Sequence, residues 1–512
     1  MTGNVLLIVI DQLRADCLTG ALAETVNLPN LRKLMAESVT FNRHCTVATP
    51  CGPSRASLLT GLYAMNHRSV RNGVPLARDH ATIGTEFRKA GYEPLLFGYT
   101  DVSPDPADRH PNDPDLKDYE GVAPGFAEIV RMRLDSNWSW AGYLKSKGYD
   151  LPKEYWDLFR PVPSEPSSQP RLSDPALYRA EDSDTAYLTD RTLQELSARV
   201  KDDWFSMVTY IRPHPPLVAP SPYNEMYAPE DVPLPVCPLS LDEHKAVHPY
   251  LNADYSAPSN RQLHAQFDGR TDNISEEDSR ELRAVYLGLA TEVDHHIGRI
   301  LDFLRDTDQY EETLIVITAD HGDMLGDHHV WGKHVPFEGS FHIPLIIRDP
   351  KNRAGAGTVV NSFTESIDLA PTLSDWVGED ANIAFNGRSL LPFLGGEQPD
   401  EWRSYTFAEV DFGDPVKSTR FQSKLGLTTA QSNFAILRDE RFSYVHFNGG
   451  LPPLLYDLKA DPHEGNNLAI NPDYSSELLR LSRMMLDHRM TFAHHAKSRM
   501  KLTQTGVRIG RV

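Results

Sequence analysis

The sequence predicts an α/β fold, with a large mixed, mostly parallel sheet flanked by helices and a smaller C-terminal α+β subdomain with an antiparallel sheet. The first observation is a set of short, largely apolar runs, of which the first is continuous and rich in β-branched residues, as is typical of parallel strands buried on both faces. These runs are residues 5–10, 92–97, 204–211, 313–318 and 343–347. The second is a change of sequence pattern near residues 396–400, after which short segments of alternating apolar and polar residues predict an antiparallel sheet. We expect a main α/β domain over residues 1–398 and the subdomain over residues 399–512.

The bulk composition limits the class of protein. A chain of 512 residues that are 40% hydrophobic and 24% charged is typical of a folded globular protein. A net charge of -20 argues against nucleic acid or an anionic membrane as the main partner. The four cysteines are too few for a disulfide framework, and no apolar run is long enough to span a bilayer. We therefore expect a cytoplasmic protein that is not bound to a membrane.

The first predicted strand, residues 5–10, is followed by Asp11 and Gln12. In open α/β sheets, ligands bind beyond the carboxyl ends of the strands. An acid at this place is a candidate metal ligand, although an Asp after a strand is equally often a helix N-cap. The residues alone leave both interpretations open.

The segment 50–61 reads Pro-Cys-Gly-Pro-Ser-Arg-Ala-Ser-Leu-Leu-Thr-Gly and predicts a helix that runs on from Ser54 and stops at Gly61. Cys51 would lie at the helix N-terminus, where backbone N–H groups and the dipole favour an anion. Arg55, one turn further on the same face, could reach that anion with a forked cation. The alternative is that Cys51 is a small buried apolar residue, as lone cysteines usually are.

Two further strands deliver polar residues to the same edge of the sheet. The strand 92–97 ends in Gly98-Tyr99-Thr100-Asp101, although a buried tyrosine is usually a packing residue with a satisfied hydroxyl. The strand 204–211 is followed by Arg-Pro-His-Pro-Pro, in which prolines on both sides of His214 would hold its backbone rigidly. A lone histidine is nevertheless more often structural. Residues 104–182 and 220–273 have weak periodicity and predict long loops.

The most informative stretch after Cys51 follows the strand 313–318. A long helix predicted over residues 282–304 precedes this strand, which ends in Asp320-His321-Gly322-Asp323. A carboxylate and an imidazole then lie at the same edge of the sheet as Asp11 and Gln12. Together they form a mixed oxygen and nitrogen set suited to one divalent cation.

The C-terminal part predicts strands at 434–437 and 442–447 and a helix over 476–494. Three histidines on this helix or at its end are expected to be solvated, namely His488, His494 and His495. The last stretch is basic, with Lys497, Arg499, Lys501, Arg508 and Arg511 and no acid among them. A basic tail on an acidic body can reach across an interface between copies, so we expect a homo-oligomer, either a dimer or a tetramer. An unstructured end is the alternative.

Several of these stretches resemble one known family. Cys-x-Pro-x-Arg at residues 51–55, followed by Leu-Thr-Gly, is similar to the sulfatase signature, in which the cysteine is oxidised to formylglycine. The closer resemblance is to bacterial phosphonate monoester hydrolases of the formylglycine-dependent branch of the alkaline phosphatase superfamily. It is carried by Asn72-x-Val-Pro-Leu, Gly-Tyr99-Thr, Pro-His214-Pro-Pro and Asp320-His321. The resemblance runs from residue 4 to about residue 469, with the motifs in family order, and implies an alkaline-phosphatase/sulfatase-like fold.

The resemblance implies a site with formylglycine at position 51 and one divalent metal ion, Mn²⁺ or Ca²⁺. The implied metal ligands are Asp11, Gln12, Cys51, Asp320 and His321. The implied catalytic residues are Cys51, Arg55, His214 and Lys333, and the implied substrate-binding residues are Asn72, Tyr99 and Asp101. Asp101 departs from the family pattern, where a threonine is expected, and its charge is unfavourable beside an anion unless it meets a cation on the substrate. For Lys333, an ordinary surface lysine is the alternative.

The resemblance also implies the reaction, which is hydrolysis of sulfate monoesters such as aryl sulfates and of phosphonate monoesters or phosphodiesters. One hydroxyl of the hydrated aldehyde would attack sulfur or phosphorus, while the metal, Arg55 and Lys333 stabilise the charge on the oxygens. His214 or Lys333 would assist the departing alkoxide, and the second hydroxyl would then expel the product. The expected partners are the small ester and a formylglycine-generating enzyme or its equivalent.

Two other classes of function stay open at this point. A two-metal phosphatase or phosphomutase of the same superfamily would keep Cys51 unmodified and would need a second cluster of His and Asp. A non-catalytic binding protein on the same fold would turn over neither ester and would show no oxidation of Cys51. Mass spectrometry of the peptide that contains Cys51 separates the first interpretation from both.

Overall fold

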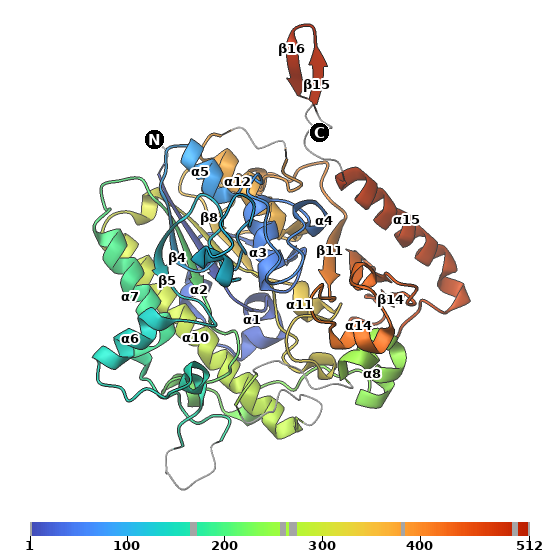
Figure 1. Cartoon of the computed structure of the whole chain (residues 1–512), viewed down its shortest axis with the longest axis horizontal. Coiled ribbons are helices and arrows are strands. Elements are labelled where there is room, and N and C mark those ends of the chain that lie inside the picture. The colour runs from blue at the N-terminus through green and yellow to red at the C-terminus, as the bar shows by residue number, and fades with distance from the viewer. Residues whose placement is uncertain are drawn as a thin grey trace.

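The computed structural model describes residues 3–163, 171–255, 263–265, 274–379, 384–493 and 500–509. Its centre is an eight-stranded sheet with the strand order β5-β4-β6-β1-β7-β8-β2-β9 (Figure 1). The strands are β1 (Asn4–Ile10), β2 (Val39–Phe41), β4 (Pro94–Gly98), β5 (Ala127–Arg131), β6 (Phe205–Tyr210), β7 (Thr313–Ala319), β8 (Leu345–Arg348) and β9 (Val359–Val360). Strand β8 runs antiparallel to β7 and β2, and the other neighbouring pairs are parallel. The predicted mixed, mostly parallel sheet is confirmed.

Helices cover both faces of the sheet. Successive side chains of a strand point to opposite faces, so each strand contributes to two cores. Leu6, Ile8 and Ile10 of β1 join one core, and Val5, Leu7 and Val9 join the other. The first core includes α2 (Pro29–Met35), α7 (Asp184–Ser197) and α10 (Glu276–Asp306). The second includes α3 (Cys51–Thr60), α5 (Ile83–Lys89) and α12 (Leu369–Trp376).

The parallel register brings the ends of distant strands together. Ile10 pairs with Tyr210 on one side and with Ala319 on the other. Asp11 and Asp320, the residues that follow β1 and β7, therefore leave the sheet at the same edge. This is the carboxyl edge at which open α/β sheets bind their ligands.

Helix α3 begins at Cys51, three residues before the run that its sequence suggested, and Gly61 ends it as expected. Gly61 has φ 65°, a left-handed conformation that a glycine adopts without steric penalty. Pro53 lies in the first turn, where its missing N–H would have no intrahelical partner. The helix thus starts with Cys51 at its N-terminus.

The C-terminal part contains a four-stranded antiparallel sheet, made of β11 (Tyr405–Asp411), β12 (Asn433–Asp439), β13 (Phe442–Phe447) and β14 (Leu454–Asp457). Helix α15 (Ser475–Phe492) packs on one face of it, and α9 (Pro249–Tyr255) and α14 (Arg420–Leu425) share a core with the other. A hairpin of β15 (Met500–Thr503) and β16 (Gly506–Ile509) projects away from the body (Figure 1). The predicted antiparallel sheet is confirmed, and the boundary at residue 398 stays a prediction.

Two predicted loop regions contain regular structure, so those expectations were wrong in part. Residues 104–182 include β5 and α6 (Trp138–Ser146), and residues 220–273 include α8 (Leu241–Val247) and α9. Strand β5 lies at the sheet edge and buries Val130 alone, so it has no apolar run to reveal it. Helix α8 has a capping box of Ser240 and Glu243, a signal that was present in the sequence.

His488 is buried rather than solvated, because α15 packs its ring against Phe407 with centroids 4.0 Å apart. His494, His495 and the basic residues 497, 499 and 511 lie outside the described residues. The remaining short elements are α1 (Asp16–Thr19), β3 (His44–Cys45), α4 (Ala64–His67), α11 (Glu338–Phe341), β10 (Thr364–Glu365) and α13 (Leu391–Leu394). Within the described ranges, no helix is long and apolar enough to cross a membrane. The cytoplasmic location stays a prediction.

Candidate active site

Cys51 lies at the N-terminus of α3 with 7% of its surface exposed. Its Sγ is 3.2 Å from His321 Nε2, 3.2 Å from Lys333 Nζ and 4.0 Å from Asp11 Oδ1. Burial and the Asp11 carboxylate raise the pKa of the Cys51 thiol well above its usual range. Because the thiolate is the nucleophilic form, an unmodified Cys51 is poorly suited to attack an ester.

Four potential metal ligands converge around this sulfur. One ligand atom each from Asp11, Cys51, Asp320 and His321 lies within 4.8 Å of all the others, and all four residues are buried. They come from the ends of β1 and β7 and from the start of α3. The two carboxylates and the imidazole suit a divalent cation that accepts both oxygen and nitrogen ligands.

The protonation states of His321 and Asp320 are also those that a metal requires. Burial lowers the pKa of His321 to about 4, so its ring is neutral at pH 7. His321 Nδ1 lies 3.0 Å from the carbonyl oxygen of Gly322 and donates to it, which leaves the lone pair of Nε2 facing the cluster. Burial favours the neutral form of Asp320, but His321, which is protonated at the low pH where this carboxyl titrates, and Arg55 hold the pKa of Asp320 below its usual range.

Arg55 connects the two carboxylates instead of standing alone. Its Nε donates to Asp320 Oδ2 at 2.9 Å, and its Nη2 donates to Asp11 Oδ2 at 3.2 Å. The guanidinium lies over the ring of Tyr99, 4.2 Å from its centroid, and the Tyr99 hydroxyl donates to Asp11. Arg55 is completely buried, so its charge acts on Cys51 in a dry environment where electrostatic effects are strong.

Gln12 and Lys333 close another side of the site. Lys333 Nζ donates to Gln12 Oε1 at 2.6 Å, in addition to its contact with Cys51. Burial opposes the charge of Lys333, but Cys51 and Asp11 raise its pKa above the ordinary value. Lys333 is therefore an ammonium ion at the sulfur of Cys51, and not an ordinary surface lysine.

The three remaining predicted residues surround this centre. Asn72 is exposed, and its Oδ1 accepts a hydrogen bond of 3.0 Å from the Gly52 N–H. The carbonyl of Asp101 is so close to Gly52 that a Cβ there would lie 3.1 Å from it. Asp101 itself is buried, and burial and Glu120 raise the pKa of its carboxyl well above the usual range. His214 is half-buried, and its Nδ1 lies 2.6 Å from the carbonyl oxygen of Pro215.

The sequence interpretation missed residues that hold this centre from behind. Ser54 Oγ donates to the backbone carbonyl of Asp320, and Tyr286 of α10 donates to the backbone carbonyl of Gln12. The carboxylate of Asp323 accepts a hydrogen bond from the Gln12 side chain. Asp323 was visible in the same motif as Asp320, whereas nothing in the sequence connects Ser54 or Tyr286 with the strand ends.

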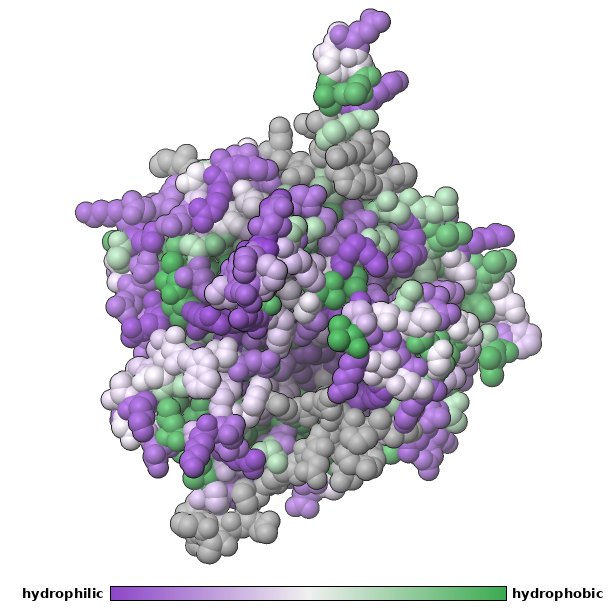
Figure 2. Space-filling model, viewed as in Figure 1, coloured by the Kyte–Doolittle hydropathy of each residue, from purple (hydrophilic) through white to green (hydrophobic). Residues whose placement is uncertain are grey.

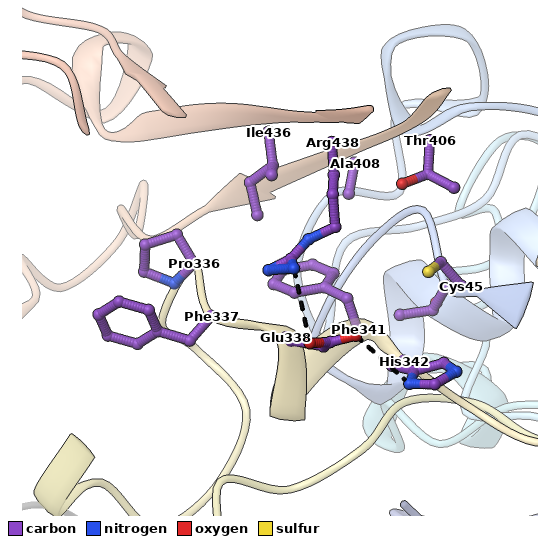
Figure 3. A pocket seen from close by; sticks show the side chains of 11 residues that line it. Cys45, Pro336, Phe337, Glu338, Phe341, His342, Thr406, Ala408, Ile436 and Arg438 are labelled. Carbon is purple, nitrogen blue, oxygen red and sulfur yellow. Dashed lines mark ion pairs between the residues drawn. The ribbon is translucent and has the colours of Figure 1, made fainter. Parts of the chain in front are cut away.

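A second cysteine lines a cavity of about 30 Å³ between α11 and the C-terminal sheet (Figure 3). In this cavity Glu338 is paired with Arg438 and His342, at 3.6 and 3.5 Å. Burial raises the pKa of Cys45 to about 12, so its thiol is protonated. A space of one water molecule with an unreactive thiol cannot take an ester, and Cys51 remains the candidate nucleophile.

The family model described as Sulfatase matches residues 3–379. The chain belongs to the sulfatase family. A second model, described as N-sulphoglucosamine sulphohydrolase, C-terminal, matches residues 326–491. The predicted resemblance is confirmed, and it covers both the strand-end site and the C-terminal sheet.

Three known proteins are similar to the chain over nearly their whole length. The multifunctional alkaline phosphatase superfamily protein PehA of Trinickia caryophylli is 38% identical over 510 residues, which are 98% of each chain. An arylsulfatase of Clostridium perfringens is 27% identical over 95% of this chain and 94% of its own. The structure of a phosphonate monoester hydrolase from Silicibacter pomeroyi is 50% identical, with a TM-score of 0.95 over 99% of each chain.

Proposed function

We propose that this protein is a metal-dependent hydrolase of sulfate monoesters, phosphonate monoesters and phosphodiesters, with formylglycine made from Cys51 as its nucleophile. The observation that carries the proposal is the convergence of Cys51 with Asp11, Asp320 and His321 in a sulfatase-family chain. The names of similar proteins, arylsulfatase and phosphonate monoester hydrolase, support both ester classes. The proposal requires a formylglycine-generating enzyme, or its equivalent, in the host.

The residues that would hold the metal are Asp11, Gln12, Asp320 and His321, together with residue 51. A single divalent cation bound there supplies Lewis-acid charge to the ester oxygens and to the nucleophile. The imidazole among the donors favours Mn²⁺ over Ca²⁺, because Ca²⁺ is bound by oxygen ligands. Among the described residues, no second cluster of this kind is present, which disfavours the two-metal phosphatase.

The side chains around residue 51 have distinct proposed roles. A hydrated formylglycine supplies a nucleophilic hydroxyl and a second hydroxyl whose deprotonation releases the product. Arg55 holds the two acids in place and adds positive charge beside the reacting centre. Asn72, at the exposed side, is placed to bind a non-bridging oxygen of the ester.

Lys333 is a better proton donor to the leaving alkoxide than His214. Burial and Lys333 lower the pKa of His214 well below its usual value, so its ring is neutral. The Nδ1 of His214 donates to the carbonyl of Pro215, and Nε2 is then left without a proton to give. Before the modification, Lys333 Nζ lies 3.2 Å from Sγ of Cys51, and the carboxylates of Asp11 and Asp320 favour its charged form as well.

A matched substrate series tests the function. Sulfate, phenylphosphonate and phosphate monoesters with the same aryl leaving group would be assayed with metal-stripped protein reloaded with Mn²⁺ or Ca²⁺. The sulfate and the phosphonate each carry one negative charge, and we expect a kcat/KM for both that is at least tenfold above that for the nearly dianionic phosphate. A higher kcat/KM for the phosphate monoester, or no turnover of any ester, would contradict the proposal.

We further propose that the projecting hairpin joins copies of the chain into a dimer or tetramer. A two-stranded hairpin is at best marginally stable alone in water. Leu502 and Val507 expose 81% and 56% of their surfaces, and apolar residues on the hairpin are visible in Figure 2. Its basic residues Lys501 and Arg508 complement a chain with a net charge of -20. Removal of residues 500–512 is expected to lower the oligomeric mass in light scattering.

A further inference from the structure

Gln12 is fixed in an unusual backbone conformation. Its φ of 68° is left-handed, which is uncommon for a residue other than glycine and persists where surrounding contacts enforce it. The N–H of Gln12 donates to Asp320 Oδ1 at 3.1 Å, and its carbonyl accepts from the Tyr286 hydroxyl at 2.8 Å. The side chain therefore leaves the backbone in one direction, toward Asp323 and toward Lys333, whose Nζ also contacts Sγ of Cys51.

The orientation of the Gln12 amide is determined by its two partners. The carboxylate of Asp323 can only accept, so the amide atom that meets it is the NH₂ group. The ammonium of Lys333 can only donate, so the atom 2.6 Å from it is the oxygen. The chemistry of Asp323 and Lys333 thus admits only one orientation of the Gln12 amide.

Asp323 is itself held firmly. Its Oδ1 accepts from the N–H groups of Leu325 at 2.6 Å and Gly332 at 3.0 Å, and the residue is 1% exposed. Its backbone carbonyl accepts from Arg14 Nη1 at 3.2 Å. The other carboxylate oxygen is thus presented to Gln12, and the bond to Gly332 fixes the residue before Lys333.

We propose that Asp323 is a positioning residue that selects the face of the Gln12 amide: by taking the NH₂ group it turns the oxygen toward residue 51, where a metal ion can bind. The inference rests on the proposed function, since it requires Gln12 as a metal ligand. An amide turned over would present N–H groups, which cannot ligate a cation and which oppose the Lys333 ammonium. Groups that orient a metal ligand typically contribute tenfold to a hundredfold in metal affinity.

The test exchanges donor and acceptor between the two side chains. Asp323→Asn retains an oxygen for the loop N–H groups but sets its NH₂ group against that of Gln12, so the amide of Gln12 turns over. When Gln12→Glu is added, the new amide at position 323 donates to one carboxylate oxygen at position 12 and leaves the other facing residue 51. We expect Asp323→Asn to weaken Mn²⁺ binding tenfold to a hundredfold in the wild-type background. In the Gln12→Glu background, the same substitution should leave Mn²⁺ binding unchanged or strengthen it.

Calorimetry with Mn²⁺ on the metal-stripped full chain measures this coupling independently of turnover. Tyr286→Phe is the matched control, because it removes a bond to the backbone of residue 12 and should act equally in both backgrounds. If Asp323→Asn weakens binding equally in the wild-type and Gln12→Glu backgrounds, Asp323 only holds its loop and the inference is overturned. If the wild-type chain binds neither Mn²⁺ nor Ca²⁺, the proposed function fails instead.

The role of Asp323 can still be tested if a chain with Asp323→Asn does not fold. The melting temperature of each stripped variant shows whether the chains with Asp323→Asn fold, and folding in the Gln12→Glu background alone supports the coupling. If Asp323→Asn prevents folding in both backgrounds, Gln12→Leu decides the matter, because it leaves the loop bonds of Asp323 intact. An Mn²⁺ affinity equal to that of the wild type would overturn the inference, and a tenfold or larger loss would support it.

Discussion

Two arginines of this protein, one buried and one partly buried, each bridge two carboxylates, and in both clusters a tyrosine hydroxyl donates to one of the acids. One cluster lies at the carboxyl edge of the main sheet, and the other lies where β11 meets the main body. Their members are Arg55, Asp11, Asp320 and Tyr99 in the first cluster, and Arg403, Glu365, Asp368 and Tyr63 in the second. Almost the same groups are thus used twice, for different purposes.

In the second cluster, backbone N–H groups donate hydrogen bonds to both carboxylates. Asp368 accepts from the N–H groups of Glu365 and Arg388, each at 2.8 Å. Glu365 accepts from the N–H of Phe407 at 2.7 Å, which ties β11 to the main body. With Arg403 and Tyr63 added, few lone pairs remain for a ligand, and the cluster is structural.

In the first cluster some lone pairs are left to converge on one point. Asp11 Oδ1 faces the sulfur of Cys51 at 4.0 Å and His321 Nε2 at 3.8 Å. Arg55 occupies one oxygen of each acid, so it orients the carboxylates without closing the site. The direction of the unused lone pairs, rather than composition or burial, distinguishes the candidate metal site from the structural cluster.

Among these substitutions, Arg55→Lys is expected to have the largest effect on catalysis. A lysine keeps the charge but cannot reach both acids with a planar fork. We expect kcat/KM for an aryl sulfate to fall roughly a hundredfold to a thousandfold, as for other losses of a preorganised charge at a reacting centre. Steady-state kinetics on protein whose folding is verified by circular dichroism provides the measurement. A loss below threefold would refute the assigned role.

Arg403→Lys is the matched change in the structural cluster. Buried hydrogen bonds to Asp368 are lost there, so we expect the free energy of unfolding to fall by about 1–3 kcal/mol. The kcat/KM of the folded enzyme should stay within about threefold of the wild-type value. Urea unfolding and kinetics on the same preparation check both parts. A larger effect on kcat/KM than that of Arg55→Lys would reverse the comparison.

Substitution of the tyrosine in each cluster is expected to have a smaller effect, on kcat/KM in the first cluster and on stability in the second. Tyr99→Phe removes a hydrogen bond to Asp11, and we expect kcat/KM to fall about tenfold, or about 1.4 kcal/mol. Tyr63→Phe removes the bond to Glu365 and should lower the free energy of unfolding by about 1 kcal/mol with little change in kcat/KM. Equal kinetic effects of the two substitutions would show that the clusters do not differ in function.

Acid should weaken the structural region through His488. Burial lowers the pKa of His488 to about 3, so below its unfolded pKa the unfolded chain binds a proton that the folded chain does not. Stability is therefore lost as the pH falls below about 6.5, and this one group accounts for about 1.4 kcal/mol at pH 5.5. Unfolding free energies of the wild type and His488→Phe at pH 7.5 and 5.5 test this. An equal loss in both chains would contradict the assignment.

The strand-end residues could be predicted from sequence because each follows an uninterrupted apolar run. Asp11 and Asp320 come after β1 and β7, and the parallel register then places them together. Strand β5 could not be recognised in the same way, since an edge strand that buries one residue leaves no such run. Cys51 was found by its motif, whereas the motif did not reveal that Arg55 bridges two acids. The contact of Arg55 with a bound anion stays a prediction.

What sequence could not supply are contacts between elements far apart in the chain. Tyr286 reaches Gln12 across 274 positions, and Ser54 reaches Asp320 across 266. Tyr286 is an ordinary tyrosine in a buried helix, and Ser54 occupies a variable position of the Cys-x-Pro-x-Arg motif, so neither pattern indicates these contacts. His488 was misjudged for the same reason, since its ring is buried by Phe407 of another element.

The most direct test of the central claim is mass spectrometry of the peptide that contains residue 51, from protein made in a host that has a formylglycine-generating enzyme. The account predicts the mass of formylglycine or its hydrate at position 51, in a fraction that rises in parallel with specific activity. A fully active preparation in which residue 51 is entirely cysteine would contradict it.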